Sequence, residues 1–137
     1  MRKICLALFL TLAVLLTGTG LSPAAAPEAD HDLNAALEKA KAQGKPLFIQ
    51  LGRESCGFCQ NLKRYLKTGS VKIDGFIYVD LNCDDQQVLK GFQERFTVSG
   101  GTLPLVVVAD STGKQLAARS GYGKPEDYQA MIDGVKK

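Results

Sequence analysis

The sequence predicts one α/β domain in which a central mixed sheet of four strands is flanked by helices. Three observations lead to this fold class: short apolar runs, helical periodicity between them, and a length that suits one core. Once a leader-like N-terminal segment is set aside, about 110 residues remain, which is enough for one domain and too few for two. The predicted order of elements is α-β-α-β-α-β-β-α.

The N-terminal segment has the pattern of a secretory signal peptide. Arg2 and Lys3 precede an almost wholly apolar run over residues 4–16, and small residues follow that run. An apolar run of about 13 residues suits a signal peptide and is short of the ~20 that span a bilayer. We therefore expect a cleaved signal peptide over residues 1–26 and an exported domain over residues 27–137, in the periplasm or another extracytoplasmic compartment. An uncleaved membrane anchor is the alternative.

The charge of the chain is nearly balanced. The net charge is +3, and without the two basic residues of the leader the chain carries 15 basic and 14 acidic residues. A balanced chain without runs of like charge lacks the footprint of a nucleic-acid surface or a polybasic membrane patch. We therefore expect no nucleic-acid partner.

The first helix is predicted over residues 32–43. Apolar residues recur there at helical spacing, with charged residues on the other side. Asp30 or Asp32 can cap the start of this helix, and Gly44 can end it. Residues 23–30 are rich in alanine and proline, and we expect them to form an irregular lead.

Three apolar runs predict the strands of the sheet. Residues 47–51 are mostly apolar, which is typical of a strand buried on both faces. Residues 76–81 and 105–109 are two further strands, and a helix over residues 86–96 lies between them. Because helices separate these three strands, we expect crossover connections and parallel pairing among them.

The C-terminal part predicts a hairpin and a last helix. The turn at residues 110–113 is short, so the strand over residues 115–119 should pair antiparallel with the strand before it. Pro125 suits the first position of a helix, and two acidic residues follow it in the first turn.

Two cysteines lie where the first strand turns into a helix. Cys56 and Cys59 are separated by two residues, and a C-x-x-C pair serves as half a zinc site, a redox dithiol or a metal-transfer loop. Zinc is disfavoured because the other candidate ligands, Cys83 and His31, form no second pair. A purely structural disulfide would close a very short ring and constrain the unfolded chain little. Cys83 itself is expected to be a small, semi-buried residue and His31 a solvated one.

The redox interpretation has a physical reason behind each part. The thiolate is the attacking species, and a helix N-terminus presents unpaired N–H groups and a positive dipole end that stabilise it. Cys56 stands just before the helix, while Cys59 is one turn further in and can attack a mixed disulfide formed by Cys56. Gly57 keeps the approach to Cys56 open. We therefore take Cys56 and Cys59 as the catalytic pair and expect no cofactor and no metal.

This arrangement resembles the thioredoxin superfamily, in particular its exported thioredoxin-like oxidoreductases. The resemblance covers nearly all of the chain after the leader, and it rests on the order of elements, the segment of residues 55–59 and the Leu103-Pro104 step before a strand. It implies that Pro104 is cis and lies against the dithiol, and that Leu103 offers its backbone to an extended substrate segment. Gly57 and Phe58 complete the expected substrate-contact surface.

The chain departs from thioredoxin at three places. Ser55 stands where thioredoxin has tryptophan, and Gly57-Phe58 replace its Gly-Pro between the cysteines. Gln50 stands where thioredoxin has a buried aspartate that accepts the proton of the second cysteine. Because an amide cannot accept that proton, it must leave through water or another group, and the reduction potential stays open.

The resemblance also indicates a function, namely protein-disulfide oxidoreductase. The chain has no room for the dimerisation domain of exported isomerases or the inserted helical domain of strong oxidases. By analogy we expect a monomeric reductase or electron relay that acts on exported protein disulfides and draws electrons from a membrane donor. The alternatives are a Cu(I)-handling module, which the lack of a methionine beside the pair disfavours, and a non-catalytic binding module.

Overall fold

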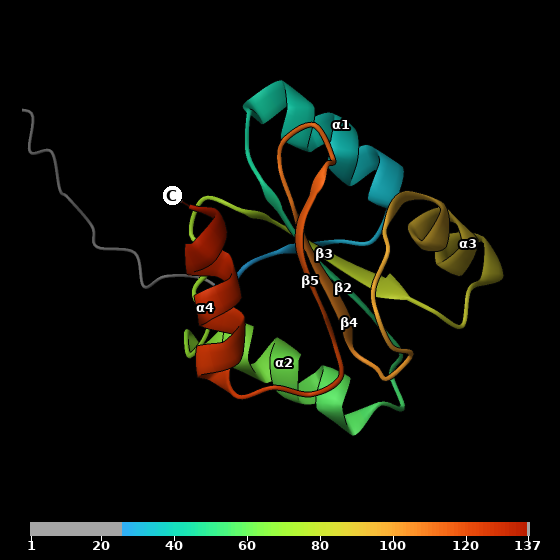
Figure 1. The fold of residues 1–137 in the computed structure, drawn as a ribbon, viewed down its shortest axis with the longest axis vertical. Helices are drawn as coiled ribbons and strands as arrows, with labels where there is room; N and C mark the ends of the chain where they lie inside the picture. Colours follow the sequence, from blue (N-terminus) through green and yellow to red (C-terminus); the bar gives the residue numbers. More distant parts are fainter. Residues whose placement is uncertain (1–25, 137) are drawn as a thin grey trace, which may run out of the picture.

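The computed structural model describes residues 26–136 and has three layers, with helices on both faces of a five-stranded sheet (Figure 1). The strands are β1 (Ala29–Asp30), β2 (Leu47–Gly52), β3 (Ile77–Asn82), β4 (Leu105–Ala109) and β5 (Gln115–Ser120). The helices are α1 (Leu33–Gln43), α2 (Gly57–Thr68), α3 (Gln86–Arg95) and α4 (Pro125–Val135). Apart from its last residue, the predicted signal peptide lies outside the described residues.

The predicted first helix is confirmed, together with the residues that bound it. The Asp32 carboxylate accepts hydrogen bonds from the N–H groups of Asn34 and Ala35 at 2.8 and 3.1 Å, which caps the start of α1. Gly44 ends the helix in the left-handed conformation, with φ of 62°.

The sheet has the order β1-β3-β2-β4-β5, which places β2 at its centre. β3 runs parallel to β2, but β4 runs antiparallel to it, so the expected parallel pairing is wrong for β4. Residues 96–104 lead the chain from α3 back to the end of the sheet at which β2 and β3 stop. β4 therefore starts at that end, where Leu105 pairs with Leu51.

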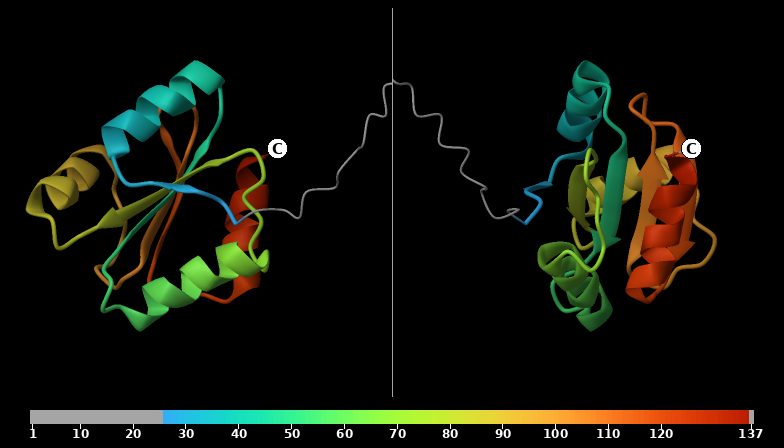
Figure 2. Two further views of the ribbon diagram at one scale, coloured as in Figure 1. Left: turned by 180° about the vertical axis from the view of Figure 1, so that it is seen from behind. Right: turned by 90° about the vertical axis from the view of Figure 1, so that its left-hand side faces the viewer.

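The fifth strand comes from the segment that we expected to be an irregular lead. Ala29 and Asp30 pair in parallel with Tyr78 and Val79 on the otherwise open edge of β3 (Figure 2). Two residues are too few to produce an alternating sequence pattern, so this strand exists only because β3 offers a partner.

Two clusters of buried side chains fill the layers between the sheet and its helices. Helices α1 and α3 cover one face, and α2 and α4 cover the other (Figure 1). All six residues of β2 are buried, including the amide side chain of Gln50. No helix within residues 26–136 is long and apolar enough to cross a membrane.

Candidate functional site

The two predicted cysteines lie at the N-terminus of α2, directly after the carboxyl end of β2. Cys56 is the N-cap residue, and its Sγ accepts a hydrogen bond from the N–H of Cys59 at 3.2 Å. The two residues are joined by a disulfide, with their Cα atoms 5.3 Å apart. One of the unpaired N–H groups of the helix start therefore points at the outer sulfur, where it would stabilise a thiolate.

The two sulfurs differ in their access to solvent. Cys56 is partly exposed, whereas Cys59 is fully buried. A Cβ atom at Gly52 would lie 2.7 Å from Cys59 Sγ, so only glycine leaves room for the inner sulfur at this place. Cys56 is thus the sulfur that another protein can reach, and Cys59 stands behind it.

A buried polar chain lies beneath the inner cysteine. Gln50 Nε2 donates to the carbonyl of Cys59 at 3.2 Å, and the Tyr78 hydroxyl donates to Gln50 Oε1 at 3.2 Å. Burial raises the pKa of Tyr78 well above its ordinary value, so this phenol keeps its proton. Gln50 therefore orients the helix start and takes no proton. Tyr78 was missed in the sequence, where a tyrosine within a strand carries no distinguishing signal.

An ion pair between Asp80 and Lys63 lies on the same side of the sheet as the Gln50 side chain. Asp80 is the register partner of Gln50 on β3, and its carboxylate binds the ammonium group of Lys63 on α2 at 2.7 Å. His31 is exposed as predicted, and its Nδ1 is also hydrogen-bonded to the backbone carbonyl of Asp80 at 2.9 Å. The Lys63–Asp80 ion pair therefore links α2 to β3.

The Leu103–Pro104 peptide bond is cis, as the resemblance implied. The N–H of Gly121 donates to the carbonyls of Thr102 and Pro104 at 2.7 and 3.0 Å and so fixes this step of the chain. Within residues 26–136 the backbone N–H and C=O of Leu103 make no hydrogen bond. These two groups are therefore available to an incoming strand.

An aromatic pair lies at the first turn of α2, where Phe58 follows the outer cysteine by two residues. The rings of Phe58 and Tyr122 are stacked with their centroids 4.9 Å apart, and the hydroxyl groups of Tyr122 and Tyr65 are hydrogen-bonded. Phe58 was a predicted contact residue and is well exposed, while Gly57 beside it is also exposed and unobstructed. Tyr122 was missed, although an aromatic residue between Gly121 and Gly123 is an unusual pattern for a plain turn.

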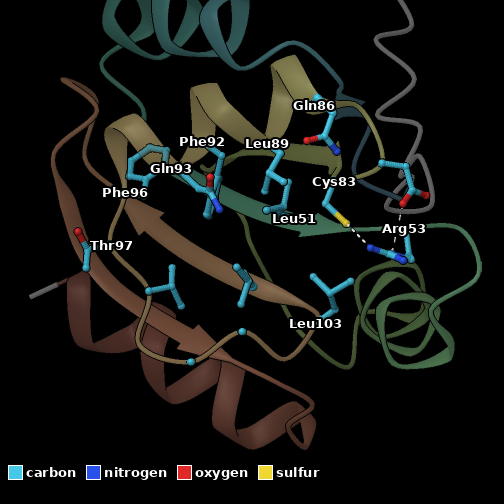
Figure 3. Close-up of a pocket in the computed structure, with 15 residues that line it drawn as sticks. Leu51, Arg53, Cys83, Gln86, Leu89, Phe92, Gln93, Phe96, Thr97 and Leu103 are labelled. Carbon is cyan, nitrogen blue, oxygen red and sulfur yellow. Dashed lines mark hydrogen bonds and ion pairs between the residues drawn. The ribbon is translucent and has the colours of Figure 1, made fainter.

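A pocket of about 630 Å³ extends from Leu103 along α3 (Figure 3). Arg53 lies at its rim, where its guanidinium donates to Cys83 Sγ at 3.5 Å and pairs with the Asp84 carboxylate at 3.4 Å. Cys83 is buried in the wall of the pocket, in agreement with the prediction for it. The positive charge of Arg53 is therefore directed at Asp84 and Cys83.

A metal site formed by at least three side chains would show those side chains converging as metal ligands do. Among residues 26–136, no three side chains of the histidine, cysteine, aspartate or glutamate type converge on one point.

The sequence of the chain matches one known protein family. A family model described as a thioredoxin-like domain matches residues 33–136. No curated protein matches the sequence significantly.

Solved structures similar in fold are thioredoxins and thioredoxin-like proteins. A thioredoxin f2, solved in complex with ferredoxin:thioredoxin reductase, is 20% identical with a TM-score of 0.64, over 80% of this chain and 94% of that one. Thioredoxin f from spinach chloroplast is 14% identical with a TM-score of 0.66, over 85% of this chain and 100% of that one. A thioredoxin-like protein from Clostridium perfringens is 14% identical with a TM-score of 0.62, over 88% and 90%. At these identities the likeness concerns the fold.

Proposed function

The chain belongs to the thioredoxin-like domain family, and on that premise we propose that it is an exported thiol–disulfide oxidoreductase acting on protein disulfides. One observation carries the proposal: the accessible sulfur of Cys56 receives a helix N–H group, and the sulfur of Cys59 is bonded directly behind it. This is the geometry in which one thiol attacks and the other releases what has been captured.

The reaction is two successive thiol–disulfide exchanges. In the reduced protein, the Cys56 thiolate attacks one sulfur of a substrate disulfide, so a mixed disulfide forms and the other substrate sulfur leaves as a thiolate that takes a proton from water. The Cys59 thiol gives its proton to solvent and attacks the Cys56 sulfur, so the mixed disulfide breaks and the second substrate sulfur leaves as a thiolate that takes up a proton. Two electrons pass to the substrate, and the Cys56–Cys59 disulfide remains.

The substrate segment is placed by the backbone. Within the described chain the N–H and C=O of Leu103, beside Pro104, have no partner, so an extended segment can add to this edge as a short strand. Gly57 leaves the space next to Cys56 open, and Phe58 borders that space. A substrate cysteine held in this way lies over the outer sulfur.

We propose that electrons flow from this protein to its substrates, so that substrate disulfides are reduced. We propose that the protein works as a monomeric reductase or electron relay. A thioredoxin that resembles this fold has been solved with a reductase, and we propose a comparable dithiol donor for this chain, anchored in the membrane. The leader-like residues 1–26 support export.

The decisive experiment is the reduction of insulin by dithiothreitol with and without the protein. We expect catalysis by the wild type, loss of that catalysis in Cys56→Ser to the rate of dithiothreitol alone, and no change in the matched control Cys83→Ser. Catalysis that persists in Cys56→Ser would overturn the proposal. Equilibration with glutathione measures the potential, and a strongly oxidising value would contradict the reductive direction.

Export has its own measurement. The full chain is expressed with its leader, and the mature N-terminus is sequenced after fractionation. We expect an extracytoplasmic product that begins near residue 25 or 27. A product that retains Met1 in the cytoplasm would overturn this part of the proposal.

A further inference from the structure

Large apolar side chains are exposed at three positions of the described chain. Within residues 26–136 these are Phe58, Leu116 and Tyr122, with exposed fractions of 51%, 44% and 39%. Leu116 stands alone on β5, whereas Phe58 and Tyr122 stack on each other. Two of the three exposed side chains thus form one surface, which we call the aromatic platform.

The aromatic platform is held rigidly although solvent reaches it. Tyr122 is fixed from three sides: its ring stacks on Phe58, its hydroxyl bonds to Tyr65, and its carbonyl accepts from the Arg119 guanidinium at 3.3 Å. A rigid exposed aromatic ring loses little conformational entropy on binding, which is why such rings act as recognition elements. Exposing the two rings to water does not stabilise the fold, because exposed apolar surface is unfavourable.

The position of the platform connects it to the dithiol and to the proposed strand edge. Phe58 follows Cys56 by two residues on the first turn of α2. Tyr122 follows Gly121, whose N–H binds the carbonyls on both sides of Leu103. The stacked rings therefore join the helix turn that begins at Cys56 to the loop that is bonded to the chain around Leu103.

The charges around the platform are only partly compensated by ion pairs. The first turn of α2 contains no acidic residue, and Arg119 is paired with Asp127 at 3.3 Å. On the other side, Arg53 is paired with Asp84. Lys124, two residues after Tyr122, and Arg64, whose charge acts on Tyr65, form no ion pair within residues 26–136. The two ring faces themselves favour an apolar or aromatic side chain, and the two cations disfavour a basic one.

We propose that Phe58 and Tyr122 bind a large apolar or aromatic side chain next to the substrate cysteine, and that they select disulfides in extended apolar segments. The inference rests on the proposed function and names the substrate class of the same site. Tyr65 and Arg119 are positioning residues, since they act through Tyr122.

The test is a pair of disulfide-linked peptides that differ at one residue next to the cysteine, phenylalanine in one and serine in the other. We expect the wild type to have a kcat/KM about tenfold higher for the phenylalanine peptide, which corresponds to one well-packed aromatic contact. In Tyr122→Ala this ratio should fall toward one, and in Tyr122→Phe it should be largely kept because the ring stack remains. Leu116→Ala, an equally exposed apolar residue away from the dithiol, should keep the wild-type ratio.

The outcomes separate this inference from the proposed function. A wild type that reduces both peptides with equal kcat/KM overturns the aromatic platform and leaves the oxidoreductase proposal standing, and this result needs no variant. A wild type that reduces neither peptide overturns the proposed function and the inference with it. A ratio that is unchanged in both Tyr122→Ala and Phe58→Ala would assign the two rings to packing alone.

Discussion

The residues buried on the two faces of the sheet differ in polarity. Under α1 and α3 the buried cluster is entirely apolar apart from the thiol of Cys83. Under α2 and α4 the buried residues include Gln50 and two tyrosines, Tyr78 and Tyr128, whose hydroxyl groups are hydrogen-bonded. The dithiol stands on this second, more polar face.

The two faces therefore contribute differently, one mainly to stability and the other to the position of specific groups. Apolar burial is non-directional, so the α1/α3 face stabilises the domain without fixing any one group in place. Buried hydrogen bonds are directional, and a missing partner is costly, so the α2/α4 face determines where the carbonyl of Cys59 and the loop around Gly121 lie. The same comparison predicts that the two faces respond differently to substitution.

The largest effect is expected on the apolar face. Leu47 is fully buried at the start of β2, away from the dithiol end of the strand. Leu47→Ala should lower the free energy of unfolding by about 2–5 kcal/mol, because a buried methyl-rich side chain is replaced by a cavity. Urea unfolding of the oxidised protein measures this loss, and insulin reduction by the folded fraction should keep its wild-type rate. A loss below about 1 kcal/mol would contradict the difference between the faces.

A smaller but more specific effect is expected on the polar face. Gln50→Leu leaves the hydroxyl of Tyr78 buried without an acceptor, and Tyr78→Phe leaves Gln50 Oε1 without its donor. Each single variant should lose about 1–3 kcal/mol of unfolding free energy. The double variant removes both polar groups together, so its loss should be clearly less than the sum.

The same variants separate stability from chemistry. Only Gln50→Leu removes the donor to the carbonyl of Cys59, so it should change the rate at which Cys59 resolves a mixed disulfide on Cys56. Tyr78→Phe should change that rate less. Stopped-flow reduction of a peptide disulfide measures the step. Additive losses in the double variant, or equal resolution rates in all three variants, would show that the two hydrogen bonds do not act as a chain.

The features that could be predicted from the sequence are local ones. The capped first helix, the dithiol at a strand–helix junction and the β4–β5 hairpin all follow from residues close together in the chain, such as Asp32, Gly44 and the Cys56–Cys59 pair. The cis bond before Pro104 followed from the family resemblance and is confirmed.

The features that could not be predicted depend on partners distant in the sequence. β1 forms because β3 has an open edge, and β4 is antiparallel because of where residues 96–104 lead. Tyr122 lies beside Phe58, although 64 positions separate them, only through the packing of the β5–α4 turn against α2. A hydrophobic pattern records which face of an element is buried, and it does not record which distant residue meets that face.

The smallest effect concerns a polar group that belongs to neither face. The Asp110 carboxylate, in the hairpin turn, accepts hydrogen bonds from the hydroxyl and N–H of Thr112 and from the N–H of Lys114, at 2.6, 2.9 and 3.0 Å. The Thr112 hydroxyl contributes most to a lowered pKa of Asp110, with the two backbone donors adding to it. A carboxyl group whose pKa is lower in the folded protein favours folding above its unfolded pKa of about 3.9.

That contribution is lost as the pH falls through the still lower pKa of the folded state. Asp110→Ala should therefore cost about 0.5–1.5 kcal/mol of unfolding free energy at pH 7, and the gap to the wild type should shrink at an acidic pH well below the unfolded pKa. Urea unfolding at both pH values measures the gap, with the exposed Asp74→Ala as the control that changes little at either. Because the turn lies at the far end of β4 from the dithiol, disulfide reduction at pH 7 should not change. A gap of equal size at both pH values would mean that the turn is stabilised by its backbone shape rather than by the ionised carboxylate.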